Sequence, residues 1–202
     1  MLDMREYAAH MMGREQLEEA LETLGAVLES RKLSSRILVA GGSSLLLLGV
    51  IDRPTADLDV LGIARSDRYV KAETIPAPLA EAARDVGLAL GLPDNWLNNG
   101  PASLFDFGLP PGFETRVSVR AYGPLEIHVV GRFDLICFKL YAAVDQSGYR
   151  TSKHLSDLKD LEPSADELRS AARWTRTHDA SEGFEAELIK MLILMGLDDV
   201  DV

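Results

Sequence analysis

The residues with the clearest chemical potential lie in the segment VAGGSSLLLLGVIDRPTADLDVLG, residues 39–62. A turn of small residues, Gly41-Gly42-Ser43-Ser44, directly follows a short apolar run. Small residues between a strand and a helix let backbone amides approach an anion, and a helix N-terminus favours negative charge. We therefore expect a phosphate-binding turn here, with a tight connection that binds nothing as the alternative.

Two aspartates, Asp57 and Asp59, follow this turn with one residue between them. On a strand, residues i and i+2 point to the same face, so the two carboxylates should be neighbours. Adjacent like charges repel, and a hard cation such as Mg²⁺, which prefers oxygen ligands, relieves that repulsion. The pair predicts a magnesium site for phosphoryl or nucleotidyl transfer. The alternative is an edge strand with a solvated charged face.

Other phosphate and nucleophile motifs do not fit the segment 39–62. The spacing G-x-x-x-x-G-K of a Walker A loop is absent, and so is the G-x-G-x-x-G of a dinucleotide site. The serines also do not match the G-x-S-x-G pattern of a nucleophile elbow. The turn and the aspartates must therefore be interpreted together.

Gly42-Ser43 followed by Asp57-Leu58-Asp59 resembles the G-S and D-x-D signature of the DNA polymerase β-like nucleotidyltransferase superfamily. The longer stretch is similar to AbiEii-type toxin nucleotidyltransferases and related uncharacterised bacterial families. Those proteins continue with a K-x-x-A helix and a later aspartate, which Lys139, Ala142 and Asp157 match in this chain. The resemblance covers roughly residues 36–161.

The resemblance implies a role for each matching residue. The turn Gly41, Gly42, Ser43 and Ser44 would hold a nucleoside triphosphate (NTP), and Asp57 and Asp59 would bind Mg²⁺. Lys139 would contact phosphate or substrate, and Asp157 would be a further catalytic carboxylate. From the residues alone, Lys139 could equally extend from a buried helix to solvent, and Asp157 could face solvent.

Three further residues are candidates for the same site. Glu126 could supply a third metal carboxylate, with His128 two residues on and therefore on the same face of a strand. Arg150 would suit a triphosphate as a bidentate partner. Trp96 could stack on a base, but the favoured interpretation is that it anchors an irregular loop to the core.

Three functions remain open from the sequence. The first is a Mg²⁺-dependent nucleotidyltransferase that moves a nucleoside monophosphate (NMP) from an NTP to an acceptor hydroxyl. The resemblance points to the tRNA 3′ end as acceptor and to pairing with a cognate antitoxin protein. The second is the same chemistry on a protein or an aminoglycoside-like small molecule. The third is a catalytically inactive fold that acts as a binding or antitoxin-like protein.

Composition limits these choices. The net charge of −11 argues against a surface covered with nucleic-acid contacts, since phosphates attract Lys and Arg. The single cysteine, Cys137, lies in an apolar context and is expected to be buried and inert. No signal peptide and no membrane-spanning run is evident, so we expect a cytoplasmic protein without a membrane partner.

Periodicity and turn residues predict a mixed α+β fold with a small nucleotidyltransferase-type sheet, flanking helices and a C-terminal helical half. We expect a core with an N-terminal helix over 1–133 and a helical region over 134–202. The expected helices are 14–32, a short one capped by Ser43 or Ser44, 77–91, 132–146, 154–161, 164–178 and 182–196. The expected strands are 37–40, 57–63 and a hairpin over 115–130, with an irregular loop over 92–113.

Overall fold

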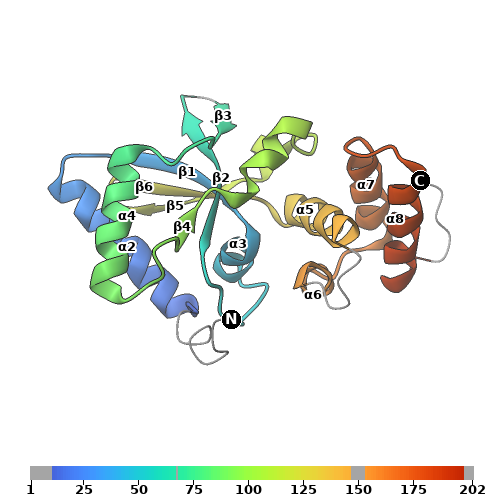
Figure 1. Ribbon diagram of the computed structural model, residues 1–202, viewed down its shortest axis with the longest axis horizontal. Coiled ribbons are helices and arrows are strands. Elements are labelled where there is room, and N and C mark those ends of the chain that lie inside the picture. Colours follow the sequence, from blue (N-terminus) through green and yellow to red (C-terminus); the bar gives the residue numbers. More distant parts are fainter. Residues whose placement is uncertain (1–10, 67, 147–152, 198–202) are drawn as a thin grey trace. The chain divides into compact units, whose positions relative to one another are not determined.

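The computed structural model describes residues 11–66, 68–146 and 153–197 (Figure 1). Its fold is mixed α+β, as the sequence predicts. The chain divides into two compact units. The first comprises Met1–Asp106 and Val117–Val130, and the second comprises Phe107–Arg116 and Gly131–Val202. Each unit is considered on its own below.

The first unit is built on one mixed sheet with the strand order β3-β2-β1-β6-β5, in which β4 pairs with β2. Strand β1 runs antiparallel to β2 and parallel to β6, so β1 is central and its residues 37–40 are fully enclosed. The strands are β1 (Ser35–Ala40), β2 (Leu58–Arg65), β3 (Arg68–Lys71), β4 (Leu97–Asn98), β5 (Ser118–Tyr122) and β6 (Leu125–Val129).

One face of this sheet is covered by helices. Helix α2 (Arg14–Ser30) packs against β5, β6 and α4 (Ala77–Leu90), and α3 (Gly41–Leu48) packs against β1, β2 and β6. The helix expected over 14–32 is present as α2, and its leucines at helical spacing, Leu17, Leu21, Leu24 and Leu28, are buried. Arg120 and Tyr122 of β5 both bond Glu18 of α2, and burial together with that bond raises the pKa of Tyr122 to about 12.

The opposite face of the sheet is called the outer face here. Strand pairing places Gly62, Leu38, His128 and Val119 in one row across it. Val119 is 56% exposed, so the helices of this unit leave the β5 end of the face open to solvent.

The region 92–113, expected to be an irregular loop, has more regular structure than predicted. It contains β4, the 3₁₀ helix η1 (Gly100–Phe107) and the start of η2 (Phe113–Arg116). Trp96 anchors this region, as predicted, because its ring is buried and its Nε1 donates to the Ala83 carbonyl at 2.8 Å.

The second unit is helical around α5 (Arg132–Asp145). Helices α6 (Lys153–Asp160), α7 (Ala165–Arg176) and α8 (Glu182–Leu194) all pack against α5. Cys137 is buried in α5, and burial raises the pKa of its thiol, which fits the inert role predicted for it. Within the described residues, no helix is both long enough and apolar enough to cross a bilayer.

The predicted domain boundary at 133/134 lies three residues from the observed division at Val130/Gly131, but one segment was misplaced. Phe107–Arg116 belongs to the second unit, and there Arg116 donates from Nε and Nη2 to the buried carboxylate of Asp134 in α5. Burial raises the pKa of that carboxyl, and the Arg116 guanidinium opposes the rise.

We expect Gly25→Ala in α2 to destabilise the first unit. A Cβ at Gly25 would lie 2.1 Å from the Tyr122 carbonyl oxygen, so helix and sheet would have to separate. The overpacking should lower the free energy of unfolding by about 1–3 kcal/mol in a urea titration. The matched control is Gly183→Ala in α8, where a Cβ meets nothing within 4 Å and should be neutral or slightly stabilising. Equal effects of the two substitutions would contradict this account of α2 packing.

Candidate functional site

The glycine turn and Asp59 are in direct contact. Asp59 of β2 pairs with Ala40, the last residue of β1, and Gly41 follows with φ +77°. A Cβ on Gly41 would lie 2.1 Å from Asp59 Oδ2, a distance that no side chain tolerates. The positive φ and the close approach of the Asp59 carboxylate therefore both require glycine at position 41. The same contact places that carboxylate against the start of α3.

The N-terminus of α3 is electrically suited to an anion. Ala40 is the N-cap residue and provides no side-chain cap, so the first amides of α3 are not satisfied by a cap. Asp59 complements the positive end of the helix dipole. A phosphate at the same place would repel Asp59 unless a cation lay between them, which is the arrangement that a metal–triphosphate requires.

Helix α3 begins at Gly41, so the prediction that Ser43 or Ser44 caps it is wrong. The positive φ of Gly41 turns the chain from β1 directly into α3, so both serines lie inside the first turn of the helix. Ser43 Oγ is buried and donates to the Ala40 carbonyl at 3.3 Å. Ser44 Oγ is buried and has no hydrogen-bond partner within the described residues. A phosphate at this turn would therefore meet backbone amides rather than these hydroxyls.

Asp57 lies just before β2 and is half-buried, as is Asp59. Its backbone is held on both sides, because Thr55 Oγ1 donates to the Asp57 carbonyl and the Leu58 amide donates to the Trp96 carbonyl. The chain around the two aspartates is thus fixed, while both carboxylates keep access to solvent.

The structure adds a neighbour that the sequence analysis missed. Strand β4 places Asn98 next to Asp59, and the Gly100 amide donates to Asn98 Oδ1 at 2.8 Å. A Cβ on Gly100 would come within 3.9 Å of Asp59 Oδ1, so this segment closes one side of the carboxylate. The cluster LNNG, residues 97–100, was the available signal, but nothing in the sequence indicates that it pairs with β2.

Glu126, the candidate third carboxylate, is not brought to Asp57 and Asp59. It pairs with Arg36, four residues before Ala40 on β1, whereas Asp59 pairs with Ala40 itself. Four strand residues span about 13 Å, and two ligands of one Mg²⁺ ion lie only about 4 Å apart. Glu126 instead lies 3.2 Å from His128 Nε2, on the shared face that the sequence predicts. The described residues contain no group of three potential metal ligands.

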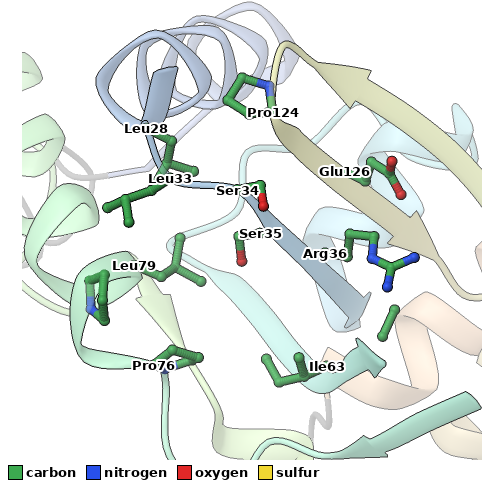
Figure 2. Close-up of a pocket in the computed structure, with 12 residues that line it drawn as sticks. Leu28, Leu33, Ser34, Ser35, Arg36, Ile63, Pro76, Leu79, Pro124 and Glu126 are labelled. Atoms are coloured by element: carbon green, nitrogen blue, oxygen red, sulfur yellow. The ribbon is translucent and has the colours of Figure 1, made fainter. Parts of the chain in front are cut away.

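A cavity of about 550 Å³ lies at the other end of β1 from Gly41 (Figure 2). It is lined mainly by leucine and proline side chains, together with Ser34, Ser35 and Arg36 at the start of β1. Glu126 is the one predicted site residue among those that line it. This cavity is therefore separate from the glycine turn.

Lys139 and Asp157 both belong to the second unit, where they form a buried ion pair. Lys139 Nζ of α5 lies 2.6 Å from Asp157 Oδ2 of α6, and Asp157 is fully buried. The solvent-facing alternatives for both residues are thus wrong. Burial, with the charges of Lys139 and Lys153, lowers the pKa of nearby His154 to about 4, so that imidazole is neutral near pH 7. Arg150 lies outside the described residues.

Comparison with known proteins does not place the chain in a family. No family model matches it, and neither the curated proteins nor the solved structures include a match. The assignment of chemistry therefore depends on the geometry of the turn and its carboxylates.

We expect Gly41→Ala to destabilise the protein more than Gly49→Ala. Both glycines have φ near +76°, so both variants carry a backbone cost of about 1–2 kcal/mol. Only Gly41→Ala displaces Asp59, because a Cβ at Gly49 would meet just the flexible end of Arg14, 3.3 Å away. Chemical unfolding should separate the two variants by more than about 1 kcal/mol. Identical losses would show that the contact between Gly41 and Asp59 is unimportant for folding.

The buried ion pair can be tested by a double-mutant cycle. Lys139→Met or Asp157→Leu alone should cost about 3–5 kcal/mol of unfolding free energy, because each leaves a buried charge unpaired. The double variant should cost much less than the sum of the two. Additive losses would mean that Lys139 and Asp157 act independently.

Proposed function

We propose that the protein is a Mg²⁺-dependent nucleotidyltransferase. The observation that supports this most directly is the Asp59 carboxylate against Gly41 at the uncapped start of α3, with Asp57 two residues away. The arrangement combines an anion-binding helix end with paired carboxylates on one short stretch of backbone. It is also the part of the chain that carries the family resemblance.

The two aspartates suit a Mg²⁺ ion whose remaining ligands include the phosphates of the substrate. Asp57 and Asp59 supply hard oxygen ligands, and Mg²⁺ commonly takes one or two carboxylates, several waters and substrate phosphates. When bound, Mg²⁺ would supply charge neutralisation for the triphosphate and the departing pyrophosphate. The absence of a third carboxylate nearby in the described residues predicts weak binding of the metal without nucleotide.

The chain's own residues would act mainly by positioning. Backbone amides at the start of α3 would bind phosphate oxygens, and the glycine at position 41 keeps that approach open. Asn98 fixes the loop beside Asp59 through its bond with the Gly100 amide. The roles that the resemblance implies for Lys139 and Asp157 remain part of the proposal, in addition to their buried ion pair.

Two classes of acceptor are compatible with this chemistry. The resemblance favours a tRNA 3′ end and a cognate antitoxin partner, and the net charge of −11 weighs against an extensive RNA surface. A protein or a cationic small molecule is the alternative acceptor. A non-catalytic binding fold is the second candidate function, and the burial of both serine hydroxyls is the observation that favours it.

The test is binding of each of the four NTPs, with and without Mg²⁺, measured by calorimetry. Binding should require Mg²⁺, and Asp57→Asn and Asp59→Asn should each weaken it by at least about tenfold, or about 1.4 kcal/mol. The matched control is Asp52→Asn, which removes the same charge from an exposed position in the same loop and should bind normally. A folded wild type that binds no NTP would refute the proposal and favour the non-catalytic candidate.

A further inference from the structure

A chain of three polar side chains crosses the outer face of the sheet. The Tyr69 hydroxyl of β3 lies 2.8 Å from His128 Nδ1, and His128 Nε2 lies 3.2 Å from Glu126 Oε2 on β6. His128 is only 9% exposed, and its ring meets that of Tyr69 edge-on with centroids 5.6 Å apart. We call these three residues the tyrosine relay.

The relay lies on the outer face of the sheet, and Asp59 is paired with a residue of β1 that belongs to that face. His128, Leu38, Gly62 and Lys71 form one row across four strands, and Tyr69 is two residues from Lys71 on β3. Asp59 pairs with Ala40, two residues beyond Leu38 on β1, and the register of β1 against β2 shifts between Leu38 and Val39. Side chains two residues apart share a face, and two residues span about 7 Å. His128 therefore lies about 7 Å along the strands from the row of Asp59, whereas Tyr69 and Glu126 start two residues further away. The Tyr69 side chain extends toward the Asp59 row to reach His128.

A small residue on β2 lies next to Tyr69. Tyr69 starts on β3, and its hydroxyl reaches a residue on β6, so its side chain must span the positions of β2 and β1. Its pairing partner on β2 is Ala64, and Gly62 lies two residues away on the same face. Ala64 presents only a methyl group to the tyrosine ring, whereas the space over Gly62 is filled by the Phe105 ring, 2.7 Å from where a Cβ would lie.

The hydrogen-bond pattern is that of an activated hydroxyl. One tautomer satisfies both contacts: the Tyr69 hydroxyl donates to Nδ1, and the Nε2–H of His128 donates to the Glu126 carboxylate. A nucleophile bonded to a base, with the base oriented by a third group, is the general signature of nucleophilic catalysis. Neither nitrogen of His128 is left for another group, so Tyr69 is the member of the relay that can attack.

We infer that Tyr69 is a nucleotidylation site within this chain, an inference that rests on the proposed function. The Tyr69 oxygen attacks the α-phosphorus of a bound NTP, and the bond from that phosphorus to the pyrophosphate oxygen breaks. The phenolic proton passes to His128 Nδ1, and Glu126 stabilises the imidazolium. The products are pyrophosphate and a phosphodiester that joins Tyr69 to the nucleoside 5′-monophosphate.

Intact-protein mass spectrometry tests this after incubation of the full chain with Mg²⁺ and each NTP. We expect a mass increase of one nucleotidyl group, which is a nucleoside monophosphate less one water, mapped by peptide sequencing to Tyr69. Tyr69→Phe removes only the hydroxyl and keeps the aromatic ring, and it should abolish the adduct. His128→Gln should slow its formation by at least about tenfold, as expected for loss of a general base. Tyr122→Phe is the matched control, because Tyr122 also donates to a carboxylate but lies outside the relay. This variant should form the Tyr69 adduct to the same extent as the wild type.

The outcomes separate this inference from the proposed function. Mg²⁺-dependent NTP binding without any adduct on the wild type would overturn the role of Tyr69 and leave the nucleotide site intact. An adduct that persists in Tyr69→Phe would also overturn it, because another residue would be the acceptor. Absence of NTP binding to the folded wild type would overturn both. An adduct at Tyr69 that forms equally fast in His128→Gln would refute activation by the relay.

Discussion

The first unit depends on one close approach, in which the carboxylate of Asp59 rests against the backbone of Gly41. Only glycine permits both the φ of +77° and the absence of a side chain at that point. Because β1 ends and α3 begins there, the contact links the central strand, the paired strand β2 and a helix N-terminus. The same contact concentrates negative charge beside a positive helix end, which is the electrostatic basis of the nucleotide proposal.

Three enclosed titratable groups, in the two units, are matched with partners. In the first unit His128 lies between a hydroxyl and a carboxylate on the outer face. In the second, Asp134 and Asp157 are fully buried, and each has a cationic partner. Burial of an unpaired carboxylate would cost several kcal/mol, so these pairs constrain which segments pack together. The pair of Arg116 with Asp134, for example, joins the segment 107–116 to α5 of the helical unit.

Most elements of the fold could be predicted from local sequence, because apolar periodicity and turn residues act over a few positions. The helix expected over 14–32 and the hairpin expected over 115–130 are confirmed within a few residues. The cap of α3 was wrong, because serine is a common N-cap and the effect of a positive φ at Gly41 cannot be seen in composition. Strand β4 was missed, because a two-residue strand has no periodicity to detect.

The sequence by itself determined the fold class, the α2 and α5 helices, the burial of Cys137 and Trp96, and the D-x-D pair beside a glycine turn. These follow from residue type and short-range spacing. The tertiary structure decided that Asp59 meets Gly41, that Asn98 borders Asp59, that Glu126 lies far from the aspartates and that Tyr69 reaches His128. Each of these depends on strand order and register, which bring together residues that are distant in the chain, and no local pattern encodes that pairing.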